Sequence, residues 1–136
     1  MPYDYFTAQQ AIASRLMEQI PSLQSATGSG RGLDPAIRRP AAAVFHEGHE
    51  PLGKGVGQSL FRQKWKVTLV VDSANDRNGA VARAMAGPLI SQIITALDGW
   101  IPAEGHSPLA ALSGGAEEYQ DGVASFDLLF ESGITI

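Results

Sequence analysis

The stretch LFRQKWKVTLVVD, residues 60–72, decides the fold that this sequence predicts. Its large apolar residues fall at alternate positions, with basic or hydroxyl side chains between them. Because successive side chains of a strand point to opposite faces of a sheet, the alternation predicts a long strand with one buried and one basic face. The apolar positions are Phe61, Trp65, Val67, Leu69 and Val71, and the other face carries Arg62, Lys64, Lys66 and Thr68.

A second alternating stretch, VASFDLLFESGITI, ends the chain at residues 123–136. Ala124, Phe126, Leu128 and Phe130 form its apolar face, while the opposite face is acidic through Asp127 and Glu131. If the two strands are antiparallel neighbours, these carboxylates lie across from the basic side chains, and each pair contributes about 0.2–1 kcal/mol. A charged face that meets only water is the open alternative, since exposed ion pairs stabilise little.

Two segments have helical periodicity. Residues 7–20 place Ala8, Ile12, Leu16 and Ile20 on one stripe, and Pro21 ends the segment. Residues 75–98 follow the same period, with Gly87-Pro88 as a predicted kink, capping at the start by Ser73, Asn75 or Asp76, and an end at Gly99 and Pro102. The predicted buried face of this second helix is Val81, Met85, Leu89, Ile93 and Leu97.

The order of elements predicts an α+β fold. Residues 41–47 form a short apolar strand, and a further short element is expected around residues 109–112. We expect a mainly antiparallel sheet of about four strands, with two principal helices packed on one face. Residues 1–136 form a single domain, with long flexible loops at about 21–40 and 47–58.

Composition limits the classes of function. The chain has 136 residues, 44% of them apolar, enough for one domain with its own core. Ten basic and 14 acidic residues give a net charge of -4, which argues against a broad nucleic-acid-binding face. The absence of cysteine excludes disulfides and a cysteine nucleophile. With no signal-peptide pattern and no apolar run of about 18 residues, we expect a soluble protein made in the cytoplasm.

The loop HEGHEPLGKGVGQS, residues 46–59, contains outlines of two enzyme motifs. A hydrolase using a metal at His46, His49, Glu47 and Glu50 is one hypothesis, but the zinc helix motif needs histidines at i and i+4. A phosphate-binding loop requires a helix after its lysine, and here Lys54 precedes a predicted strand. We therefore expect no catalytic residues, no metal site and no cofactor.

The order of elements also shows a resemblance to a known protein family. It rests on AQQAIASRLMEQI (8–20), PAAAVF (40–45), RQKWKVTLVVDS (62–73), ARAMAGPLISQIITAL (82–97) and VASFDLLFESGITI (123–136), with a variable loop ending in Pro40. With these elements, nearly the whole chain resembles the tail terminator proteins of long-tailed bacteriophages, the family that includes the lambda terminator and its Mu-like relatives. The loops at residues 24–39 and after Phe45 depart from the family pattern.

The resemblance implies a structural virion protein that forms a hexameric ring at the head-proximal end of the tail tube. Such a ring ends tube polymerisation and joins the head. Its implied partners are its own copies, the tail tube protein and a neck or head-completion protein. The resemblance implies neither a membrane nor sequence-specific nucleic acid, although DNA passes through such a ring.

Another ring of the phage neck, such as a connector, is the structural alternative. Oppositely charged patches on separate faces are one way to close a ring, and we expect the loops to become ordered on assembly. The candidate interface residues are Arg31, Arg38, Arg39, Lys54, Arg62, Lys64, Lys66, Asp127 and Glu131.

Overall fold

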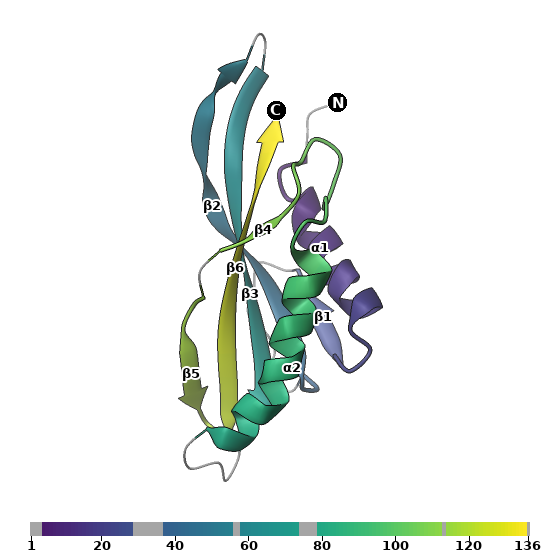
Figure 1. Cartoon of the computed structure of the whole chain (residues 1–136), viewed down its shortest axis with the longest axis vertical. Helices are drawn as coiled ribbons and strands as arrows, with labels where there is room; N and C mark the ends of the chain where they lie inside the picture. The colour runs from purple at the N-terminus through teal and green to yellow at the C-terminus, as the bar shows by residue number, and fades with distance from the viewer. Residues whose placement is uncertain (1–3, 29–36, 56–57, 74–78, 113, 136) are drawn as a thin grey trace.

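The computed structural model describes residues 4–28, 37–55, 58–73, 79–112 and 114–135. A six-stranded sheet has the order β1-β2-β3-β6-β4, with β5 also pairing with β6, and both helices lie on one face of it (Figure 1). In chain order the elements are α1 (Thr7–Gln19), β1 (Ser25–Thr27), β2 (Ala41–Gly55), β3 (Gln58–Asp72), α2 (Ala80–Leu97), β4 (Ala110–Ala111), β5 (Glu117–Gln120) and β6 (Val123–Thr135).

The predicted α+β class with two helices is confirmed, but the sheet is larger than expected and mixed. β1 runs parallel to β2, whereas the other pairings are antiparallel. The strands that were not predicted are short: β1 has three partly buried residues, and β5 has four exposed residues. Such segments lack the periodic apolar pattern that marks a strand in sequence. The element expected near residues 109–112 is β4.

The inward-facing residues of β3 form the centre of the core. Trp65, Val67, Leu69 and Val71 are fully buried, and each pairs directly with an inward residue of β6. The predicted neighbourhood of the two strands is therefore confirmed, with Trp65 opposite Phe130 and Leu69 opposite Phe126. α1 packs Ile12 and Leu16 on the same layer.

Polar contacts tie the helices to this layer. The buried Gln9 of α1 donates from Nε2 to the carbonyl of Val44, 2.8 Å away, just beyond the residues of β2 that pair with β1. Arg15 donates from Nε to the carbonyl of Ala96 at 3.0 Å, and its guanidinium lies over the Trp100 ring. α1 is thus held against the sheet on one side and against the end of α2 on the other.

The buried face of α2 differs from the prediction in its first half. The structure buries Ala82 and Ala86 against the sheet and leaves Val81 and Met85 exposed, while Leu89 is buried as expected. Small side chains let the helix approach the sheet closely, so geometry selects the alanines over the larger residues beside them. The helix also begins at Ala80, so Ser73 does not cap it, and Asn75 and Asp76 lie outside the described residues.

The predicted loop at residues 47–58 is wrong for most of its length. β2 continues to Gly55 and pairs with β3 along its whole course, so the glycine-rich stretch is strand with two register shifts. Glycine tolerates the left-handed backbone that such irregularities need, as Gly48 and Gly53 show with φ values of 105° and 138°. The predicted loop at residues 21–40 contains β1, and residues 29–36 of it lie outside the described residues.

Two alanines of α2 test the corrected helix face. Ala86→Leu places three extra carbons into the packed layer and should lower the free energy of unfolding by about 1–3 kcal/mol. Ala84→Leu changes an exposed position of the same helix and should stay within about 0.5 kcal/mol of the wild type. Urea unfolding followed by circular dichroism measures both values, and equal destabilisation by the two variants would contradict the assigned face.

Candidate assembly surface

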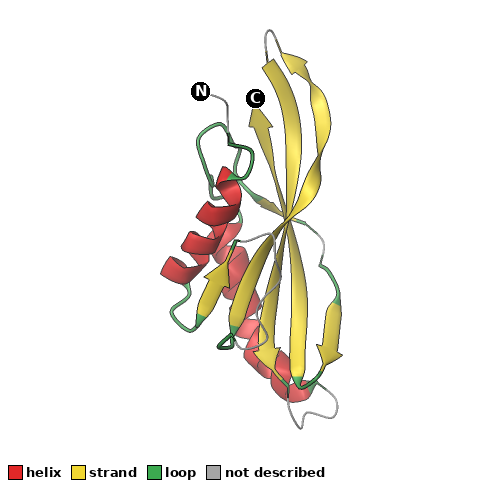
Figure 2. Ribbon diagram, turned by 180° about the vertical axis from the view of Figure 1, so that it is seen from behind, coloured by secondary structure: helices red, strands yellow, loops and turns green. Residues whose placement is uncertain are grey.

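The β2–β3 hairpin forms an arm that extends past the two helices (Figure 2). The arm consists of residues 45–55 of β2 and residues 58–66 of β3, with residues 129–135 of β6 alongside. Helices cover one face of the body, whereas the opposite face of the sheet continues without helices from body to arm (Figure 1). The candidate interface residues of β3 and β6 lie on this outer face.

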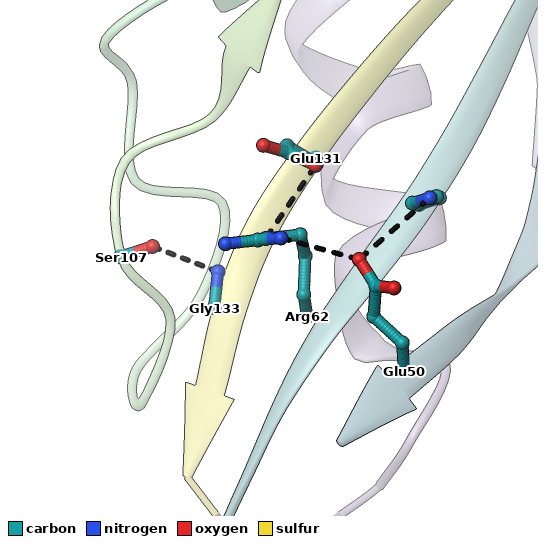
Figure 3. Close-up of polar contacts among 6 residues, drawn as sticks. Glu50, Arg62, Ser107, Glu131 and Gly133 are labelled. Atoms are coloured by element: carbon teal, nitrogen blue, oxygen red, sulfur yellow. Dashed lines mark hydrogen bonds and ion pairs between the residues drawn. The ribbon is translucent and has the colours of Figure 1, made fainter. Parts of the chain in front are cut away.

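The outer face of the arm carries alternating columns of charge. Arg62 of β3 lies between two carboxylates, with its Nη1 3.2 Å from Oε1 of Glu50 on β2 and its Nε 3.5 Å from Oε2 of Glu131 on β6 (Figure 3). Lys64 Nζ is 3.7 Å from the same oxygen of Glu50. Lys66 Nζ is 3.2 Å from Oε1 of Glu47. We call this set Glu47, Glu50, Arg62, Lys64, Lys66 and Glu131 the charge ladder.

The charge ladder differs from the predicted arrangement of oppositely charged patches on separate faces. The basic and acidic residues do not occupy separate faces of the subunit, because neighbouring strands place them on one face, where they neutralise one another. Asp127 is not part of the ladder: it lies opposite Thr68, whose hydroxyl donates to Oδ1 at 2.7 Å. Each exposed ion pair is worth at most about 1 kcal/mol, so the ladder adds little to the free energy of unfolding.

A β-bulge at Glu47 sets the direction of the neighbouring histidines. Residues 46 and 49 would point to opposite faces of a regular strand, but the register shift between His46 and Gly48 inserts one extra residue. Both imidazoles therefore face inward, where Tyr5 contacts each ring and its hydroxyl hydrogen-bonds Nδ1 of His49. The residues before α1 are thereby attached to the inner face of the arm.

The same bulge separates the ligands of the hypothetical metal site. His46 and His49 point inward to Tyr5, whereas Glu47 and Glu50 point outward and bind the cations of the charge ladder. Among the described residues, no group of three or more histidine, cysteine, aspartate or glutamate side chains could hold a metal. The geometry gives no support to the metal-dependent hydrolase.

Burial keeps two histidines neutral. Desolvation is the main cause that lowers the pKa of His46 below its usual 6.5, with the charge of His49 adding to the effect and Glu47 opposing it. Burial also lowers the pKa of His106, whose Nδ1 lies 2.9 Å from Oγ of Ser132. Both side chains thus serve as neutral parts of the inner layer.

The remaining candidate interface residues are not part of the charge ladder, and one of them lies outside the described residues. Arg39 donates from Nε to Oδ1 of Asp72 at 2.6 Å, although the two residues are 33 positions apart in sequence. Arg39 therefore has a partner within the single subunit. Arg38 is exposed beside it, at the end of the body remote from the arm. Arg31 lies outside the described residues; Lys54 is on the arm, opposite Ser59. Their predicted contacts in an assembly stay predictions.

Sequence reasoning missed Tyr5 and Gln63 as organising residues. Gln63 is fully buried and donates from Nε2 to the carbonyl of Tyr5 at 2.9 Å. Its position in the alternation, between Phe61 and Trp65, is the signal that could have revealed it, because it is a polar residue at an inward position. No comparable signal marks Tyr5, whose role depends on the bulge 42 residues later in the chain.

Comparisons with known proteins agree with this architecture. A family model described as "Phage tail terminator protein" matches residues 1–136. A chain from the virion of the native gene transfer agent (GTA) particle has a similar fold, with a TM-score of 0.64 at 14% identity, over 98% of this chain and 100% of that one. No curated protein matches the sequence.

The neutral histidines predict a pH dependence of stability. The unfolded chain binds protons at His46 and His106 near pH 6.5, and the folded chain does so only at lower pH. The stability that the two neutral histidines contribute to the fold is fully present above about pH 6.5. It is lost as the pH falls through their pKa values in the folded chain. The free energy of unfolding changes with pH by at most about 1.4 kcal/mol per pH unit for each histidine, and this change is the slope to be measured.

Urea unfolding at pH 7.5 and pH 5.5 measures this slope in the wild type and in His46→Gln/His106→Gln. The wild type should lose more free energy of unfolding than the variant between the two pH values. Equal losses would show that neither histidine is held neutral by the fold.

Proposed function

Because this chain belongs to the phage tail terminator family, we propose that it forms the ring, of six copies, that caps the head-proximal end of the tail tube. The family is one of structural virion proteins, so the chain is a structural component of a phage tail and not an enzyme. In the proposed role the ring stops tube polymerisation and presents the surface that joins the head. Its partners are then its own copies, the tail tube protein and a neck protein.

The arm is the observation that carries this proposal. β2 and β3 have 15 residues each, which at about 3.3 Å per residue corresponds to roughly 50 Å. The outer face of the arm is charged and uncovered, whereas its inner face buries Gln63 and Trp65. A projection of this kind supplies contact area for neighbouring subunits, which a ring needs on two sides of each copy.

The structural likeness supports the same role. The similar chain belongs to a virion, and the similarity spans both chains almost completely. The arm and the helices are therefore part of one fold that a virion particle also contains, which is consistent with assembly into a tail.

Removal of the gene from the phage tests the proposed position. Electron microscopy of the particles should show tails longer than those of the wild type and without heads, because nothing ends tube growth. Expression of the protein in the same host should restore tail length. Tails of normal length that fail only to join heads would contradict a terminator role and indicate a connector.

A further inference from the structure

A short segment before α1 lies across the inner face of the arm. This segment consists of residues 4–6, and we call it the strap. The buried Gln63 donates from Nε2 to the carbonyl of Tyr5 at 2.9 Å, and the Tyr5 hydroxyl hydrogen-bonds Nδ1 of His49. The rings of Tyr5 and His46 are in edge contact, with their centroids 4.8 Å apart. The strap therefore contacts both strands of the arm, β2 through the histidines and β3 through Gln63.

A group of buried polar atoms lies beside the strap. Within the part of the chain that the structure describes, three buried side-chain atoms have no hydrogen-bond partner, namely Nε2 of His46, Oε1 of Gln63 and Nε1 of Trp65. His46 pairs with Trp65 across the strands, with ring centroids 4.9 Å apart, and Gln63 precedes Trp65 by two positions on the same face. A buried polar group without a partner has lost its water and carries the full desolvation penalty. The closed strap is therefore less stable than its contacts alone indicate.

The apolar contacts of the strap offset only part of this penalty. Phe6 is 53% exposed, and Tyr5 is only partly buried. Because hydrophobic stabilisation is proportional to the area removed from water, a half-exposed ring contributes about half of its full value. The bond from the Tyr5 hydroxyl goes to the exposed His49, where water competes for both groups. The closed and open arrangements of the strap thus differ little in free energy.

α1 does not depend on the strap for its position. Phe6 occupies the N-cap of the helix without a side-chain capping bond, and the first turn has no acidic side chain. The helix is held instead by its buried apolar face and by the hydrogen bond from Gln9 to the carbonyl of Val44. The strap has its own turn, in which the Asp4 carboxylate accepts from the backbone N–H of Phe6 at 3.0 Å. It can therefore leave the arm as a unit while α1 stays in place.

We propose that the strap is a reversible latch, which opens without unfolding of the sheet and uncovers the inner face of the arm. Opening returns water to His46 and Gln63, and it breaks the hydrogen bonds that join Tyr5 to the arm. Local openings of this kind require much less free energy than global unfolding. The latch is a property of the single subunit, so it is independent of the proposed ring.

Limited proteolysis measures the opening directly. Chymotrypsin cleaves after Tyr5 and Phe6 only when the strap is extended and free, so the cleavage rate follows the open population. Tyr5→Phe keeps the cleavage site and removes the hydrogen bond to His49, and it should raise the rate by about two- to tenfold. His46→Phe removes the unpartnered Nε2 and keeps an aromatic ring against Tyr5, and it should lower the rate by at least about fivefold.

The rates are measured on the single chain, at a concentration where light scattering gives the mass of one copy. Each rate is divided by that of a peptide of residues 1–12 with the same residue at position 5, which removes the preference of the protease for one ring over another. Mass spectrometry identifies the cleaved bond, and circular dichroism confirms that each variant is folded.

Tyr119→Phe is the matched control. It makes the same chemical change and removes a hydroxyl that donates to Glu117 on β5, which lies beside the body and not the arm (Figure 1). Cleavage of this variant after Tyr5 and Phe6 should proceed at the wild-type rate.

Two results would overturn the latch. Equal rates for the wild type, Tyr5→Phe and His46→Phe would show that the strap frays without regard to the arm. A cleavage rate that rises in urea as steeply as the unfolding equilibrium would show that the strap opens only with the whole fold. The expected rates in a protein that forms no rings would support the latch and contradict the proposed function alone.

Discussion

Every part of this molecule depends on the two-sided pairing of β3. One edge of this strand hydrogen-bonds to β2 and the other to β6, so its alternation determines which residues of three strands face the helices. Trp65 and Lys64 are neighbours in sequence, yet one is fully buried and the other joins the charge ladder. A shift of register by one residue would exchange the core for the ladder along the whole sheet.

The bulge at Glu47 uses the same rule locally. One extra residue reverses the alternation of β2 at the start of the arm, which turns His49 inward and brings Glu50 opposite Arg62. The inner side of the arm then meets Tyr5 and the outer side completes the ladder. A single backbone irregularity therefore attaches the residues before α1 to the arm and also removes the geometry that a metal site would need.

The sequence was sufficient to predict the structural features whose pattern repeats over many residues. The alternations of β3 and β6 extend over a dozen positions, so their faces and their pairing could be predicted. The buried face in the second half of α2 was also predicted, with Leu89, Ile93 and Leu97 buried. The first half could not be predicted, because Ala82 and Ala86 are selected by close approach to a sheet whose position the helix sequence does not contain. β5 and the end of β2 were missed for the opposite reason: EEYQ and GHEPLGKG read as loop, and only the neighbouring strands make them pair.

The arrangement of charge affects any contact that would cover the outer face of the arm. Lys66 and Arg62 are satisfied by carboxylates of their own chain, so a neighbouring subunit that covered them would have to displace those partners or bury the pairs. Uncharged surfaces such as Val81 and Leu52 require no such exchange, and covering them removes apolar area from water. The charges of the ladder are thus satisfied within one chain, whereas Val81 and Leu52 are exposed apolar residues.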